Sequence, residues 1–328
     1  MPTASKPRRQ APALIKPPAL RLGDGIGVVA PASYFKRESF DHGIAALRRM
    51  GYEPIYQDSI FDRDLYFAGS AARRAREVEE MFARDDVRAI VCVRGGYGAN
   101  YLLPHIDLDI IRRYPKIFCG YSDITCLLTW FNDAAGLVTF HGPMVAGDFQ
   151  REHGINEMAW TSATGGNSNW ELASHQVFGL NPMIPGHGEG VLYGGCLSIL
   201  VASLGTPYEA QTEGKLLFLE DIAAKPYQID RMLVQMKYAG KLRDVKGIIF
   251  GEMMDCVQSL DQPYTLQEVV QRIVGDLNVP VAYGLKSGHV SRENATLPFG
   301  VQARLLVTDQ TVRLDVLECA VVSQGLSS

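Results

Sequence analysis

The sequence predicts an α/β protein with two domains, an N-terminal domain built on a parallel sheet and a C-terminal α+β or β-rich domain. Two observations predict it. Short apolar runs alternate with amphipathic segments through the first third of the chain, as in parallel sheets covered by helices on both faces. The chain also has 328 residues, more than the roughly 250–300 at which single hydrophobic cores stop growing.

The N-terminal domain is expected to contain four strands of a parallel sheet, at residues 26–30, 53–56, 89–93 and 117–119, of which the apolar run at 26–30 is typical of a buried strand. Between the first two, Phe40, Ile44 and Leu47 recur at helical spacing. Ser70 is a suitable N-cap for a second helix. This alternation is typical of flavodoxin-like and Rossmann-like domains.

The second half of the chain has a different pattern. Residues 149–189 are rich in glycine, asparagine and proline and show little periodicity, which predicts a linker or crossover loops. Later segments predict strands near 216–219, 247–250, 281–283 and 303–307, and helices near 230–238 and 266–274. We therefore expect a flexible tail at 1–20, a nucleophile-bearing domain at 21–148, a linker at 149–189 and a C-terminal domain at 190–328.

Composition excludes several classes of function. A net charge of −4 provides no basic field for nucleic acid or anionic membranes. No apolar run approaches the roughly 18–20 residues of a membrane span, and the basic, proline-rich start lacks the apolar stretch of a signal peptide. We therefore expect a cytoplasmic protein. The cysteines form no C-x-x-C pair and the histidines have no metal-ligand spacing, so we expect no disulfide framework, metal or cofactor.

The sharpest local feature is the segment at residues 116–125, where a strand ends at Gly120, turns through Ser122 and runs into a helix. This is the layout of a nucleophile elbow, in which a tight turn exposes a serine hydroxyl beside free N–H groups of a helix N-terminus. The last glycine of the G-x-S-x-G pattern is replaced by Ile124. Ser122 is therefore a candidate nucleophile, with a helix N-cap as the alternative.

A glycine-rich loop, Arg94-Gly95-Gly96-Tyr97-Gly98, follows the third strand. Glycines at the carboxyl end of a parallel strand let backbone N–H groups face a phosphate or an oxyanion. The loop matches neither the Walker pattern nor G-x-G-x-x-G, which argues against a nucleotide. A plain tight turn is the alternative.

A serine nucleophile needs a base, and the base needs an orienting acceptor. Glu220 stands at the carboxyl end of a predicted strand, and His289 lies in a loop rich in glycine and serine. Either side chain could instead be a solvated polar residue. His141, which follows another apolar run, is a rival base.

The chain resembles the LD-carboxypeptidase family from residue 21 to about 316. The motifs that carry the resemblance occur in family order: LGDGI (22–26), APAS (30–33), FAGS (67–70), RGGYG (94–98), GYSD (120–123), HGP (141–143), FLED (218–221), IDRML (229–233), GH (288–289) and TLPFG (296–300).

The resemblance implies a catalytic triad between the two domains. Ser122 would be the nucleophile, His289 the general base and then acid, and Glu220 the group that orients the imidazole. The backbone N–H groups of Gly96 and Asp123 would form the oxyanion hole. The implied reaction removes the terminal D-alanine from cytosolic murein tetrapeptide during cell-wall recycling, and members commonly form homodimers.

One position departs from the family pattern. Cys196 stands where the family usually has asparagine, and a thiol cannot reproduce the hydrogen bonds of an amide. Two alternative functions remain open. One is the microcin-immunity branch of the family, which cleaves aminoacyl-nucleotide-like substrates and lacks the RGGYG form of the loop. The other is a non-catalytic module that binds sugars or peptides.

Overall fold

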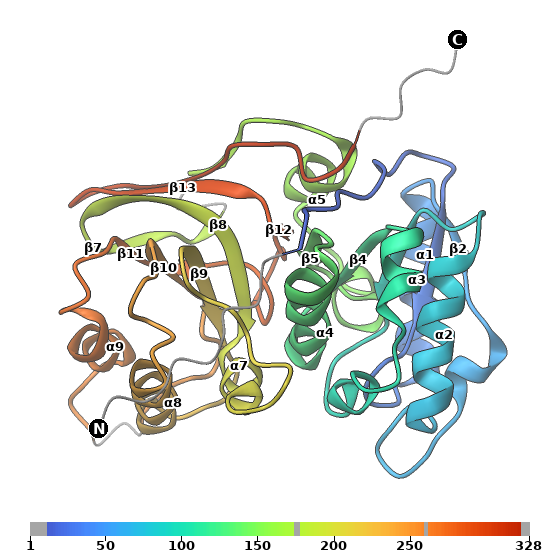
Figure 1. Ribbon diagram of the computed structural model, residues 1–328, viewed down its shortest axis with the longest axis horizontal. Helices are drawn as coiled ribbons and strands as arrows, with labels where there is room; N and C mark the ends of the chain where they lie inside the picture. The colour runs from blue at the N-terminus through green and yellow to red at the C-terminus, as the bar shows by residue number, and fades with distance from the viewer. Residues whose placement is uncertain (1–11, 174–177, 259–261, 323–328) are drawn as a thin grey trace.

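Two β-sheets organise the computed structural model, which describes residues 12–173, 178–258 and 262–322 (Figure 1). Within these residues the first sheet has the strand order β12-β5-β4-β3-β1-β2, and the second has the order β6-β14-β13-β8-β9-β10-β11-β7. The two-domain α/β architecture expected from the sequence is therefore confirmed.

The first sheet is doubly wound. Its parallel strands are β1 (Gly25–Val29), β2 (Glu53–Ile55), β3 (Ala89–Cys92), β4 (Ile117–Gly120) and β5 (Thr139–His141). Their spatial order 2-1-3-4-5 is that of flavodoxin-like domains, in which ligands bind outside the carboxyl ends of the strands. All four predicted strands are present. Strands β1, β3 and β4 are continuous apolar runs buried on both faces, whereas β2 lies at the edge of the sheet and is partly exposed.

The helices of this domain follow their capping and periodicity signals. They are α1 (Arg37–Arg49), α2 (Ala71–Ala83), α3 (Leu108–Arg113) and α4 (Thr125–Trp130), with 3₁₀ turns η1 (Asp58–Phe61), η2 (Ala99–Leu102) and η3 (Ser122–Ile124) and π-helical turns η4 (Phe131–Ala135) and η5 (Val145–Phe149). The predicted stripe on α1 is buried. Ser70 caps α2, since its hydroxyl accepts a hydrogen bond from the Arg73 N–H.

The second sheet has a parallel centre and antiparallel flanks. The parallel strands are β8 (Gly186–Cys196), β9 (Lys215–Glu220), β10 (Gly247–Gly251) and β11 (Val281–Leu285), and the flanking strands are β6 (Trp170–Leu172), β7 (Asn181–Ile184), β13 (Gln302–Val307) and β14 (Val312–Val316). Helices α7 (Leu197–Ser203), α8 (Pro226–Tyr238) and α9 (Leu266–Val274) lie along one side of this sheet (Figure 1).

Residues 149–189 were predicted to be a linker or crossover loops, but the structure shows regular elements there. The segment contains α5 (Glu157–Gly165), β6, β7 and the start of β8. The glycines that hid β8 in the sequence are required by close backbone approach. A Cβ at Gly194, for example, would lie 1.9 Å from the Phe218 carbonyl oxygen of the neighbouring strand.

Two segments, one near each end of the chain, do not follow the predicted domain boundaries. Strand β12 (Leu297–Phe299) comes from the C-terminal half but pairs with β5 of the first sheet. Residues 12–20 belong to the predicted tail, yet the Ile15 N–H donates to the Gly136 carbonyl at 2.8 Å and Leu20 is buried. These residues therefore pack on the fold instead of forming a flexible segment. The rest of the predicted tail, residues 1–11, lies outside the described residues.

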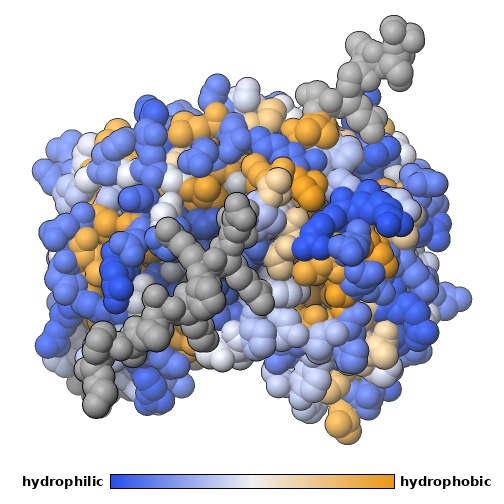
Figure 2. Space-filling view, viewed as in Figure 1, coloured by the Kyte–Doolittle hydropathy of each residue, from blue (hydrophilic) through white to orange (hydrophobic). Residues whose placement is uncertain are grey.

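Helix α4 joins the two sheets, because it contacts β4 and β5 on one side and β8 and α7 on the other. One cluster of buried hydrophobic side chains extends across this junction and includes both Phe118 and Phe218. On the face shown in Figure 2, hydrophobic residues occur in patches among hydrophilic ones. None of the helices in the described part of the chain combines the length and apolarity of a membrane span.

Candidate active site

Ser122 lies in the sharp turn between β4 and the helical segment that begins with η3. Its φ of 63° lies in the left-handed region, which costs a non-glycine residue roughly 1–2 kcal/mol. Strain of this kind persists only where the surroundings enforce it, and it occurs often at functional sites. The geometry is the strand–turn–helix arrangement that the sequence led us to expect.

The glycine-rich loop after β3 touches this serine. A Cβ at Gly95 would lie 2.7 Å from Ser122 Cβ and 2.9 Å from its Oγ, so only glycine fits there without displacement. Gly96 has a φ of 105°, which a side chain rarely adopts. The Ser33 hydroxyl braces the same loop by accepting a hydrogen bond from the Tyr97 N–H at 3.1 Å.

Asp123 fastens the turn to this loop. Its buried carboxylate accepts a hydrogen bond from the Ala99 N–H at 2.7 Å. Burial raises the pKa of Asp123 to about 6, although the Ala99 hydrogen bond and the charge of Arg74 act in the opposite direction. The buried Arg74 guanidinium also donates to the Gly98 carbonyl at 2.8 Å. Sequence reasoning missed Arg74, because nothing in a helical Arg-Arg pair shows which guanidinium is buried.

Glu220 and His289 form a buried hydrogen-bonded pair. Glu220 ends β9 and its side chain is fully buried, whereas the His289 side chain is 14% exposed. Glu220 Oε2 lies 2.7 Å from His289 Nδ1 and also accepts the His289 N–H at 3.1 Å. Burial alone would raise the pKa of Glu220, but the charge and hydrogen bonds of His289, together with the nearby His141 imidazole, outweigh burial and lower that pKa to about 2.

The same pairing acts on the histidine. Burial disfavours the imidazolium of His289, but the negative charge and hydrogen bond of Glu220 outweigh burial and raise the pKa of His289 above its ordinary value. A carboxylate on Nδ1 also fixes the tautomer, so that Nε2 is free to accept a proton.

His289 packs against Tyr121, the residue that precedes the proposed nucleophile. Its ring packs edge-on against the Tyr121 ring, with 5.1 Å between centroids. Among the described residues the Ser122 hydroxyl makes no hydrogen bond, so the serine–histidine contact is not closed. Such contacts are often long without substrate and tighten in the reacting complex.

His141, the rival base, occupies a different position. Its side chain is fully buried, and its Nδ1 lies 2.9 Å from the Ser287 hydroxyl. Its Nε2 lies 3.8 Å from Glu220 Oε1, the carboxylate oxygen that His289 does not use. Full burial leaves His141 no exposed edge for a substrate, whereas His289 keeps one.

Cys196 borders the site without the properties of a nucleophile. It pairs in register with Glu220 across β8 and β9, and its Sγ lies 3.3 Å from the Ser198 hydroxyl. Burial, together with the charges of Glu220 and Asp221, raises the pKa of the Cys196 thiol well above its ordinary value. The thiol therefore stays protonated and unreactive.

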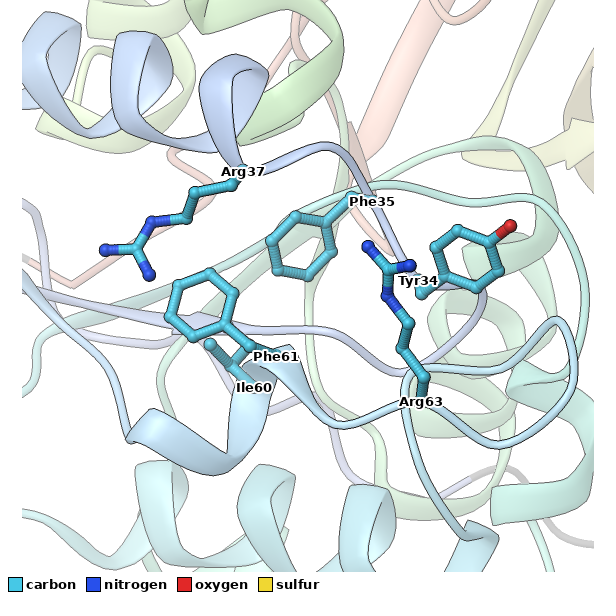
Figure 3. A pocket seen from close by; sticks show the side chains of 6 residues that line it. All are labelled: Tyr34, Phe35, Arg37, Ile60, Phe61 and Arg63. Atoms are coloured by element: carbon cyan, nitrogen blue, oxygen red, sulfur yellow. The ribbon is translucent and has the colours of Figure 1, made fainter.

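A separate pocket lies in the first domain, lined by Tyr34, Phe35, Arg37, Ile60, Phe61 and Arg63 (Figure 3). Its two guanidinium groups lie over aromatic rings, Arg37 over Phe61 and Arg63 over Tyr34. Ser122, Glu220 and His289 do not line it. Across residues 12–173, 178–258 and 262–322, no three His, Cys, Asp or Glu side chains gather as metal ligands would.

Comparison with known proteins identifies the family. Residues 26–142 match the model of the LD-carboxypeptidase N-terminal domain, and residues 189–305 match that of the LD-carboxypeptidase C-terminal domain. A probable murein peptide carboxypeptidase of Bacillus subtilis (strain 168) is 38% identical over 313 residues, covering 94% of this chain and 96% of that protein. The chain belongs to the LD-carboxypeptidase family.

Two further proteins, with different names, are similar to the chain. The Microcin C7 self-immunity protein MccF of Escherichia coli is 29% identical over 315 residues, covering 86% of this chain and 90% of that protein. The crystal structure of a muramoyltetrapeptide carboxypeptidase from Oxalobacter formigenes superposes with a TM-score of 0.80 at 28% identity, covering 90% of this chain and 99% of that one.

Proposed function

We propose that this chain is a serine carboxypeptidase that hydrolyses an L,D-amide bond and releases terminal D-alanine from murein tetrapeptide in the cytoplasm. The observation that carries the proposal is the arrangement of two features at the carboxyl ends of their strands. The first is a strained serine turn, and the second is a carboxylate–imidazole pair packed against the adjacent tyrosine. This is the set of groups that acyl transfer through a serine requires.

The first half of the reaction forms an acyl-enzyme. Ser122 Oγ attacks the carbonyl carbon of the scissile bond while His289 Nε2 takes its proton, and Glu220 stabilises the resulting imidazolium. The backbone N–H groups of Gly96 and Asp123 stabilise the negative oxygen of the tetrahedral intermediate. One such oxyanion-hole donor lowers the activation free energy by roughly 3 kcal/mol. His289 then gives its proton to the departing amine, and the C–N bond breaks.

The second half returns the enzyme to its starting state. His289, again neutral, takes a proton from a water molecule, and the oxygen of that water attacks the acyl carbon. The bond between the acyl carbon and Ser122 Oγ breaks, the proton on His289 passes to Ser122 Oγ, and the carboxylic acid product leaves. No metal or cofactor takes part in this scheme.

The substrate class comes from the relatives. Proteins named murein peptide or muramoyltetrapeptide carboxypeptidase match over nearly the whole chain, which favours a murein-derived peptide and a place in cell-wall recycling. The match to MccF, a protein solved in complex with aspartyl sulfamoyl adenosine, favours an aminoacyl-nucleotide-like substrate as the second candidate.

We also propose that the protein forms a homodimer, which sedimentation equilibrium would test.

The deciding experiment compares two substrates. Purified protein is incubated with murein tetrapeptide or with an aminoacyl sulfamoyl nucleotide, and mass spectrometry follows loss of D-alanine or of the nucleoside. We expect D-alanine release. Nucleotide cleavage without D-alanine release would replace the first candidate by the second. A fluorophosphonate that fails to label the wild-type protein would point instead to a binding module.

Variants test the residue assignments. Ser122→Ala and His289→Ala should each lower kcat by several orders of magnitude, because the triad acts as a unit. His187→Ala is the matched control, since His187 lies 3.5 Å from Glu189 in an exposed histidine–glutamate pair. Turnover of the Ser122 variant within about tenfold of wild type would refute the nucleophile assignment. Loss of activity in His141→Ala but not in His289→Ala would show that the base is the other histidine.

A further inference from the structure

His141 and Glu220 face each other with one unused polar atom each. His141 Nε2 and Glu220 Oε1 are both buried, and neither has a hydrogen-bond partner among the described residues. The distance between these two atoms is 3.8 Å. Buried polar atoms are nearly always paired, so two unpaired atoms that face each other call for a common explanation.

The other hydrogen bonds of Glu220 and His141 determine which polar atom of each side chain has no partner. Glu220 uses Oε2 for both hydrogen bonds to His289, which leaves only Oε1 on the other side. His141 uses Nδ1 for the Ser287 hydroxyl, at 2.9 Å. If Ser287 donates to Nδ1, the ring proton is on Nε2 and points toward the carboxylate. The opposite tautomer would aim a lone pair at a negative oxygen.

Packing holds the His141 ring in this orientation. The ring lies edge-on to Phe218, with 5.1 Å between centroids, and 5.5 Å from the Phe299 ring. Gly288 closes the corner, because a Cβ there would lie 2.7 Å from Glu220 Cδ and 2.8 Å from His141 Cε1. The imidazole therefore has little freedom to turn away from the carboxylate.

We propose that His141 is a positioning residue. Its Nε2–H faces Glu220 Oε1 across 3.8 Å, donates to that oxygen when the two atoms close to hydrogen-bond distance, and so holds Oε2 against His289. The carboxylate then lies between two imidazoles, one that meets the substrate and one that does not. This inference rests on the proposed Ser122, His289 and Glu220 triad, and it adds a residue that acts on the reaction only through Glu220.

The contact also crosses between the two domains. His141 ends β5, and it pairs in register with Gly120, two residues before Ser122. Glu220 ends β9 of the second sheet. The histidine thus connects the strand that carries the proposed nucleophile to the acid–base pair. A shift of about 1 Å at such a junction can lower a reaction rate by about 100-fold.

The first test measures the rate constant for fluorophosphonate labelling of Ser122, which needs the triad but no knowledge of the substrate. His141→Leu removes the donor, and we expect labelling to slow by about 10- to 100-fold. His141→Gln keeps an N–H donor, and we expect it to restore labelling to within about fivefold of wild type. A merely structural role would not separate these two variants by donor chemistry.

Thr139→Val is the matched control. Thr139 is fully buried two residues away on the same strand and donates to the Leu128 carbonyl at 3.2 Å. We expect this variant to lose stability but to label at the wild-type rate. Labelling of His141→Leu within about threefold of wild type, or His141→Gln as slow as His141→Leu, would overturn the proposal.

A second measurement does not depend on the folding of any variant. Long-range ¹H–¹⁵N spectra of the wild-type imidazoles report which ring nitrogen carries the proton. We expect His141 to be protonated on Nε2, and protonation on Nδ1 alone would overturn the proposal. Failure of the substrate assignment is distinguishable, because it would appear as labelling of Ser122 without release of D-alanine.

Discussion

From the strained turn at Ser122 we predict a change that separates stability from activity. A non-glycine residue in the left-handed region raises the free energy of the folded state by roughly 1–2 kcal/mol. Glycine, in turn, stabilises the unfolded chain by about 0.4–1 kcal/mol through its greater backbone entropy. With the φ of 63° at this position, Ser122→Gly should therefore be more stable than Ser122→Ala by about 0.5–1 kcal/mol. Both variants lack the hydroxyl, so both should be inactive.

The assay is differential scanning calorimetry of the two variants side by side. At roughly 2.1 cal/mol/K per residue, unfolding all 328 residues in one transition changes the entropy by about 0.7 kcal/mol/K. The expected difference in Tm between the glycine and alanine variants is therefore about 1 °C. A domain that unfolds separately would show a larger shift.

Two matched pairs serve as controls. Leu65 has a φ of 53° and is 80% exposed, so Leu65→Gly should also be more stable than Leu65→Ala. Arg76 is exposed within α2, where the glycine variant should be less stable than the alanine variant by about 1 kcal/mol. If the Leu65 pair behaves as expected and Ser122→Gly is no more stable than Ser122→Ala, the reasoning about strain at the elbow is wrong.

Three further predictions concern the rest of the site. The pKa of about 2 at Glu220 lies below its ordinary value of 4.5, so its contribution to stability is complete above pH 4.5 and is lost toward pH 2. Glu220→Gln should therefore differ most from wild type near neutral pH and converge with it in acid, as measured by chemical unfolding. Because the pKa of His289 is raised, kcat/KM should rise with pH through a midpoint above 6.5. EDTA should leave kcat/KM unchanged. Activity that EDTA abolishes and zinc restores would refute the serine mechanism. Gly95→Ala would place a Cβ 2.9 Å from Ser122 Oγ and should lower kcat by at least about tenfold, whereas Gly165→Ala, where nothing lies within 4 Å, should leave kcat unchanged.

Local pattern was enough to predict most of the first domain and the candidate nucleophile. A strand buried on both faces must be apolar along its whole length, and β3 and β4 are. A helix on a sheet must repeat its apolar residues at helical spacing, as α1 does. The turn at Ser122 was also visible, because a glycine and a serine at the end of such a strand precede a helical run. These features depend on neighbours along the chain.

The sequence by itself also pointed to Glu220 and His289, but only as strand-end and loop residues among several. Tertiary structure decided that they meet, at 2.7 Å, and that the other histidine, His141, lies on the far side of the carboxylate. The position of His141 beside Glu220 depends on strand register, since His141 pairs with Gly120. Strand β8 was hidden for the same reason, because its glycines are needed only where β9 approaches. Contacts between residues so far apart in the chain have no periodic trace in the sequence, and the folded structure alone determines them.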